Sequence, residues 1–142
     1  MALESIIPPE TLLAYLETDF IVFDQQILIL KIDNYSEALR NLYKAHKIKT
    51  CIVISAYNPY GQVLKESVNI KRNTDLTTEL DYKDLKYFPG EGKHPAGKWL
   101  SESSYLVLDL SLEESCALGK KYEQNAIIWC DSDCVPQLVL LR

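Results

Sequence analysis

The segment Cys51–Tyr57, CIVISAY, constrains the fold of this chain more than any other stretch of its sequence. Its nearly continuous apolar composition is typical of a central strand that is covered on both faces of a sheet. Such a strand needs a packed layer on either side. We therefore predict an α/β (α+β) domain in which helices pack on a mixed sheet of about five strands.

The flanking sequence supplies the expected layers. A hairpin is predicted where two groups of β-formers, at 20–23 and 27–32, surround a short polar stretch. Helix starts are indicated by Pro8-Pro9, by Asn34 or Ser36, and by Ser111, which has a glutamate at capping-box spacing. A long helix over about 63–80 and strands at 85–89, 104–110, 126–130 and 137–141 complete the pattern. The helices after the strands 51–57 and 104–110 are expected to form right-handed crossovers.

Length and charge exclude several classes of protein. The 142 residues suffice for one domain, which we expect to span 1–142, and are too few for two separate cores. A net charge of −5 argues against a phosphate-backbone binder, so we expect no nucleic-acid partner. No signal peptide is recognised at the N-terminus, and no apolar run reaches the roughly 20 residues of a membrane helix. With its four cysteines interpreted as reduced thiols, the chain is predicted to be cytoplasmic and to contact no membrane.

Three motifs are weak evidence for a cofactor, a metal or a nucleophile. Residues 92–98 have the spacing of a phosphate-binding loop, but Trp99 stands where a magnesium-binding Ser or Thr is needed, and a strand is predicted next. Cys130 and Cys134 have poor spacing for structural zinc and lack a second Cys/His pair. Ser103 with His94 is a conceivable hydrolase pair, but no nucleophile elbow surrounds the serine. We predict no metal site and no cofactor.

The segment Gly90–Leu110 holds most of the polar residues that ordinary folding does not explain, in a glycine- and proline-broken loop that leads into a strand. Asn69 and Arg72 lie on the apolar face of the predicted helix at 63–80, so each needs a partner in the protein or in a ligand. If strand 104–110 runs antiparallel to 51–57, the polar residues flanking the strands meet at one end of the sheet, which we predict. The candidate ligand-binding residues are Asn58, Asn69, Arg72, Trp99, Glu102, Ser103, Gln124 and Asn125.

Two interpretations of these residues stay open. In the structural one, Arg72 pairs with Glu102 inside the protein, Asn58 forms a turn and Asn125 caps a helix. In the functional one, Arg72 binds an anionic group in a cleft, Trp99 stacks on the ligand and the amides read its polar edges.

Five short segments, in order, resemble a family of bacterial domains of unknown function, numbered 3293. They are Thr18-Asp19-Phe20, Ser55-Ala56-Tyr57-Asn58-Pro59, Asn69-x-x-Arg72-Asn73, Trp99-x-x-Glu102-Ser103 and Tyr122-Glu123-Gln124-Asn125-Ala126, and the resemblance covers nearly the whole chain. The family pattern favours Trp at Tyr57 and Gly at Glu123, which puts a tight turn at Glu123 in doubt. The resemblance implies bacterial origin and a stand-alone domain, and it carries over no activity and no catalytic residue.

Three functional hypotheses follow. The first is a site for a small anionic or nucleotide-like metabolite around Arg72 and Glu102. The second is a non-catalytic domain that binds or regulates a protein partner through aromatic residues, namely Tyr57, Tyr60, Tyr87 and Trp99. The third is an enzyme with Glu102 as general base, which requires that this carboxylate be solvent-accessible, free of Arg72 and within reach of a cleft.

Overall fold

The predicted central strand is present as β3, Cys51–Ile54, in the computed structural model of the chain, which describes residues 5–98 and 100–142. All four of its side chains are buried. They alternate between two cores, with Cys51 and Val53 on one face of the sheet and Ile52 and Ile54 on the other. This alternation explains the continuous apolar run, because a strand covered on both faces has no solvent side.

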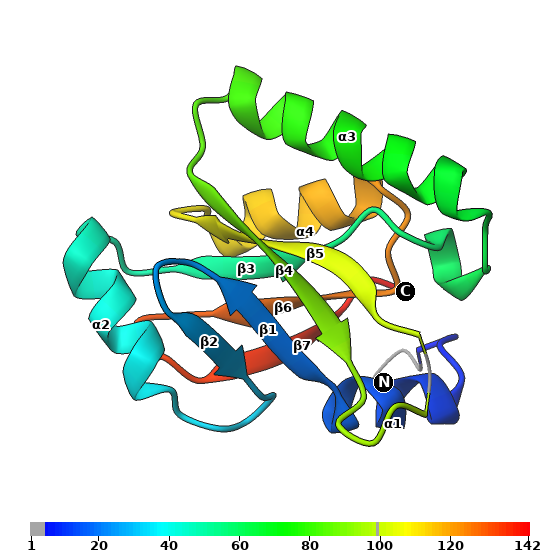
Figure 1. The fold of residues 1–142 in the computed structure, drawn as a ribbon, viewed down its shortest axis with the longest axis horizontal. Helices are drawn as coiled ribbons and strands as arrows, with labels where there is room; N and C mark the ends of the chain where they lie inside the picture. The colour runs from blue at the N-terminus through cyan, green and yellow to red at the C-terminus, as the bar shows by residue number, and fades with distance from the viewer. Residues whose placement is uncertain (1–4, 99) are drawn as a thin grey trace.

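β3 lies in a seven-stranded sheet with the order β2-β1-β4-β5-β3-β6-β7 (Figure 1). The other strands are β1 (Asp19–Phe23), β2 (Ile27–Leu30), β4 (Tyr87–Lys93), β5 (Glu102–Leu108), β6 (Ala126–Cys130) and β7 (Pro136–Leu140). The α+β class and the hairpin of β1 and β2 are confirmed.

The sheet differs in detail from the predicted mixed sheet of about five strands, because seven strands are described and each neighbouring pair among them is antiparallel. The connections from β3 to β4 and from β5 to β6 do join strands that point the same way. Each connection passes over one intervening antiparallel strand, however, so the parallel strands never become neighbours.

Helices cover both faces of the sheet (Figure 1). They are α1 (Pro9–Glu17), α2 (Glu37–His46), α3 (Glu66–Tyr82) and α4 (Leu112–Lys121), with a 3-10 turn at Pro59–Gly61. Ser36, rather than Asn34, caps α2 by accepting from Leu39 N, and Ser111 forms the predicted capping box with Glu114 at the start of α4. Among the described helices, none combines the length and apolarity needed to cross a bilayer.

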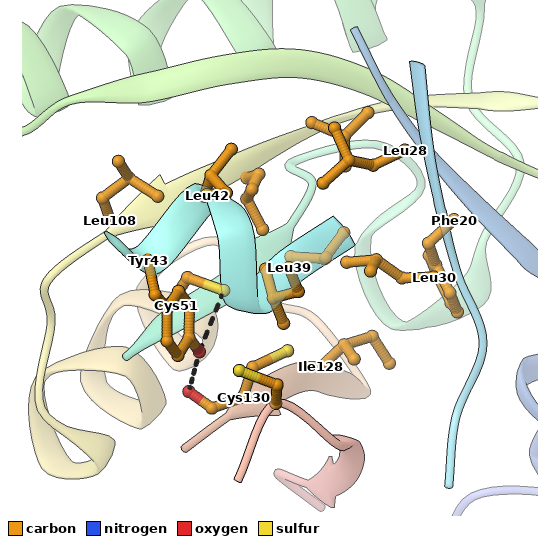
Figure 2. Close-up of a cluster of buried hydrophobic side chains, with 14 of the residues drawn as sticks. Phe20, Leu28, Leu30, Leu39, Leu42, Tyr43, Cys51, Leu108, Ile128 and Cys130 are labelled. Atoms are coloured by element: carbon orange, nitrogen blue, oxygen red, sulfur yellow. Dashed lines mark hydrogen bonds between the residues drawn. The ribbon is translucent and has the colours of Figure 1, made fainter. Parts of the chain in front are cut away.

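The first core lies between α2 and one face of the curled sheet, and Figure 2 shows Leu39, Leu42 and Tyr43 of α2 within this cluster. Tyr43 of α2 reaches β6, where its hydroxyl donates to the Cys130 carbonyl at 3.0 Å and lies 3.6 Å from Cys51 Sγ. The curl brings the chain after β2 to the start of β7, because Asp33 N donates to the Pro136 carbonyl at 2.8 Å.

The second core lies on the opposite face, beneath α3 and α4. Leu76, Leu80 and Leu118 of these helices pack on side chains of β3, β5 and β6. Gly119 permits α4 to pack closely on β6, because it has no side chain. A Cβ at this position would come within 2.7 Å of the Ile127 side chain.

The predicted loop at Gly90 is instead strand, because β4 runs from Tyr87 to Lys93. Gly90 pairs with Val22 of β1, and a Cβ at this position would overlap the Ile21 carbonyl oxygen. The close approach of β1 to β4 therefore requires glycine at this position. The irregular loop begins only after Lys93.

Candidate functional site

The antiparallel pairing of β3 with β5 and β6 brings Asn58, Glu102 and Gln124-Asn125 to one end of the sheet, as predicted. β3 ends opposite the beginning of both neighbours, with Ile54 paired to Tyr105 and Val53 paired to Ile128. The turn after β3, the first residue of β5 and the turn before β6 therefore lie together. These three places hold Asn58, Glu102 and Gln124.

Asn58 is the centre of a hydrogen-bond network at this end. Its Nδ2 donates to Glu102 Oε1 at 2.7 Å, and its Oδ1 accepts from Leu64 N at 3.0 Å and from Asn69 Nδ2 at 2.7 Å. Its backbone N donates to Asn69 Oδ1 at 2.9 Å. The residue has a φ of 46°, in the left-handed region that asparagine tolerates better than most residues. Asn58 thus fixes both the turn and the Glu102 carboxylate.

Two asparagines on α3 anchor the segment that follows β3. Asn69 and Asn73 are 3% and 4% exposed, four residues apart on the buried face of the helix. Asn73 Oδ1 accepts from Ala56 N at 2.8 Å, and its Nδ2 donates to the Ser103 carbonyl at 3.2 Å. Asn69 was expected from the sequence and Asn73 was missed, although helical spacing places both on the same face.

Arg72 makes a structural contact that differs from both sequence interpretations. Its Nε donates to the Ala56 carbonyl at 2.6 Å and its Nη2 to the Tyr122 carbonyl at 2.7 Å, while Glu123 Oε1 lies 3.5 Å from Nη1. The predicted pair with Glu102 does not form. The guanidinium joins the turn after β3 to the turn before β6, and Arg72 is absent from the described lining of the pocket beside it.

A pocket of about 450 Å³ opens where the strand pairing ends. We call it the Glu102 pocket, and Tyr15, Phe20, Asn58, Glu102, Gln124 and Ile128 define its walls. Its volume falls in the range that small-molecule sites occupy. More of its lining surface is apolar than polar, although serine, threonine, asparagine, glutamine and glutamate side chains also line it. The candidate residues Asn69 and Asn125 also line it.

Glu102 presents one carboxylate oxygen to this pocket. Oε1 accepts from Asn58, whereas Oε2 has no hydrogen-bond partner within the described residues and is not sealed from solvent. Burial raises the pKa of the Glu102 carboxyl above its ordinary value, and the hydrogen bond from Asn58 only partly opposes this effect. No cation among the described residues contributes to this pKa. The group is a partly desolvated acid whose charge the described protein leaves uncompensated.

Helix α1 forms one wall of the pocket and holds a residue that was not expected from the sequence. Tyr15 lies near Glu102 and Asn125, and burial together with the Glu102 charge raises the pKa of its phenol to about 12. No residue of α1 is fully buried, but Tyr15 is half-buried and packs against the first core. No local motif marks Tyr15, because its role depends on where α1 packs.

The remaining candidates have different positions. Gln124 Nε2 donates to the carbonyls of Tyr57 and Tyr122, at 3.0 and 3.1 Å. Asn125 does not cap α4, which ends at Lys121, and it accepts instead from Arg142 at 2.9 Å. Ser103 contributes its backbone carbonyl to Ser55 and Asn73 and is not in the pocket lining. Trp99 lies outside the described residues.

The three described aromatic residues suggested for a protein interface, Tyr57, Tyr60 and Tyr87, do not share one exposed surface. Tyr57 is buried, and its hydroxyl donates to Glu66 Oε1 at 2.8 Å, both residues lining the pocket. Tyr87 is half-buried against Tyr105, and Tyr60 is exposed beneath the Arg142 guanidinium, 4.1 Å from the ring centroid.

The fold and the pocket define a small α+β domain with a ligand-sized cavity at the open end of its central strands. The profile described as "Protein of unknown function (DUF3293)" matches residues 54–127, more than half of the chain, and the chain belongs to this family. Four of the five segments noted in the sequence overlap the match, and Thr18-Asp19-Phe20 lies outside it. Searches of curated proteins and of solved structures found no match.

Proposed function

We propose that this domain binds a small, mainly apolar organic molecule in the Glu102 pocket, through hydrogen-bond donors on the ligand. The observation that carries the proposal is the combination of a cavity of about 450 Å³ with a Glu102 carboxylate held at its wall by Asn58. A carboxylate is costly to bury without a partner, and a small molecule that fits the cavity can supply that partner.

This proposal replaces the anionic ligand expected from the sequence. Arg72 was expected to bind the anion, but its guanidinium is hydrogen-bonded to two backbone carbonyls, and Arg72 is not among the described residues that line the pocket. The pocket instead contains the carboxylates of Glu102 and Glu66, which repel an anion.

The proposal is tested by placing a side chain in the cavity. Ala14 lies on α1 and lines the pocket, so Ala14→Phe adds a ring where the ligand binds. Ala45→Phe on the exposed side of α2 adds the same ring away from the pocket and is the matched control.

The measurement is a screen of small organic fragments by two-dimensional NMR, following the side-chain amide signals of Asn58, Gln124 and Asn125. We expect fragments that shift these signals in the wild type and in Ala45→Phe, and that lose their effect in Ala14→Phe. The proposal is wrong if fragments perturb scattered surface residues only, or if a folded Ala14→Phe binds them as well as the wild type does.

A second candidate function is acid–base catalysis by Glu102. Two observations support it, because the Glu102 carboxylate lines a cavity and is not paired with Arg72. A raised carboxyl pKa also suits a general base that works near neutral pH. Any fragment found to bind is incubated with wild type and with Glu102→Gln. Conversion detected by mass spectrometry in the wild type alone supports catalysis, and binding without conversion supports a binding domain.

A further inference from the structure

The Glu102 pocket presents hydrogen-bond acceptors that lack donors. Glu102 Oε2 has no partner within the described residues, while Oε1 is held by Asn58. Gln124 is oriented by its Nε2, which donates to two backbone carbonyls, so its Oε1 is the atom left without a described partner. Both side chains line the pocket. A ligand that satisfies them must donate hydrogen bonds.

The described lining of the same pocket contains no Lys, Arg or His side chain. Its ionisable residues are the carboxylates of Glu102 and Glu66 and the phenols of Tyr15 and Tyr57. Two arginines near it make contacts outside the pocket, since Arg142 donates to Asn125 Oδ1 and stacks on Tyr60. Arg72 is likewise bonded to carbonyls. The negative charge of Glu102 has no counter-ion among these residues.

The apolar part of the lining suits the same kind of ligand. Phe20, Tyr15 and Tyr57 bring aromatic rings to the cavity, together with aliphatic side chains from β3 and β6. Aromatic faces attract cations when the site excludes water, and apolar walls bind the hydrocarbon part of a molecule.

From these observations we propose that the ligand of the Glu102 pocket is an organic cation, whose ammonium, amidinium or guanidinium group donates to Glu102 and Gln124. This inference rests on the proposed binding function and specifies its chemical class. A charge-assisted hydrogen bond to a partly desolvated carboxylate is stronger than a neutral one, and the positive charge replaces the missing counter-ion.

A charge series on one hydrocarbon frame tests the inference. Benzylamine, which is an ammonium ion at neutral pH, benzyl alcohol and benzoate differ mainly in the charge of their head group. Each is titrated against the wild type by NMR at about pH 7.5, where the free carboxylates and amines of these compounds are ionised. Glu102→Gln keeps the shape of the side chain and removes its charge, while Glu113→Gln, at an exposed position on α4 outside the described pocket lining, is the matched control.

We expect benzylammonium to bind the wild type at least tenfold more tightly than benzyl alcohol, and benzoate to bind more weakly than either. In Glu102→Gln this preference falls to within about twofold, whereas Glu113→Gln retains it. If benzyl alcohol binds the wild type as tightly as benzylammonium does, the cation inference is wrong and the binding function stands. If none of the three binds, the cation inference is also wrong, and the fragment screen decides the binding function separately. The wild-type series alone decides between these outcomes even if Glu102→Gln does not fold.

Discussion

Replacing Asn58 with aspartate exchanges one nitrogen atom for oxygen at the centre of the network. The new carboxylate keeps an oxygen that accepts from Leu64 N and from Asn69, so these contacts need not change. The contact with Glu102 Oε1, now a hydrogen bond of 2.7 Å, becomes a contact between two carboxylates. The substitution therefore tests how strongly this single bond supports the site.

The expected cost depends on pH. Two like charges about 4 Å apart repel by about 4 kcal/mol at an effective dielectric constant of about 20, and the pair avoids part of this by retaining a proton. We expect Asn58→Asp to lower the free energy of unfolding by about 2–4 kcal/mol at about pH 8. The folded-state pKa of the pair is raised above its unfolded value, so the destabilisation grows as pH rises through the folded pKa and disappears below the unfolded one.

The assay is urea unfolding of wild type and variant at about pH 4.5 and about pH 8, on either side of the expected titration. Asn41→Asp, on the exposed surface of α2, is the control, and it is expected to change stability by no more than about 0.5 kcal/mol at either pH. Equal destabilisation by Asn58→Asp at both pH values, or a loss below about 0.5 kcal/mol at the higher pH, refutes the assigned contact with Glu102.

Four further substitutions test other contacts in the structure. Glu102→Gln is expected to melt at a higher temperature than wild type near pH 8 and at the same temperature near pH 4, because the raised pKa of Glu102 means that its ionised form destabilises the folded state. A lower melting temperature of the variant near pH 8 contradicts this. Arg72→Ala should lose about 2–3 kcal/mol in urea unfolding, since two carbonyls lose a charged donor, and a neutral result would show that the contacts are incidental. Gly90→Ala should lose about 2 kcal/mol or more from its overlap with β1, and unchanged unfolding contradicts the close approach. Burial opposes ionisation of Glu79, but hydrogen bonds from Lys121, Lys83 and Tyr122 lower its pKa to about 2. Glu79→Gln should therefore lower the free energy of unfolding by about 1 kcal/mol near pH 7, allowing for solvent screening, and leave it unchanged near pH 2. A loss of stability that persists at the lower pH contradicts the ion pairs.

Local patterns in the sequence identified those features of the fold that neighbouring residues determine. The apolar run at Cys51 indicated a strand covered on both faces, and the spacing of Ser111 and Glu114 indicated the start of α4. The convergence of Asn58 with Glu102 also followed from the sequence, because it required only that β5 run antiparallel to β3.

Features that depend on distant partners were not predictable. The segment that begins at Gly90 has the composition of a loop, and only the pairing with β1 makes Gly90 part of a strand. The need of Arg72 for partners was clear, but its partners are backbone carbonyls that carry no signature in the sequence. Tyr15 joins the pocket through the packing of α1, which its own helix pattern does not specify.

The turn at Glu123 shows how a family pattern and a structure inform each other. The pattern favours glycine there, and the backbone of Glu123 has a φ of 57°, a conformation that glycine adopts more easily than glutamate does. The turn is kept despite the side chain, because Tyr60 N donates to the Glu123 carbonyl at 2.7 Å and Arg72 lies against its carboxylate. The doubt about a tight turn at this position is thereby removed.

If Glu102 anchors a cationic ligand and has no counter-ion in the protein, the carboxyl carbon of this residue reports on it directly. The measurement is a carbon-13 NMR titration of protein labelled at the glutamate side-chain carboxyls, with Glu102 and Glu66 assigned from their glutamine variants. We predict a pKa of Glu102 above the ordinary glutamate value in the free protein, and a fall when benzylammonium saturates the pocket. Tyr15, with a pKa of about 12, stays protonated throughout. An ordinary pKa of Glu102 in the free protein, or a pKa that the bound amine does not lower, would contradict its role as a ligand anchor.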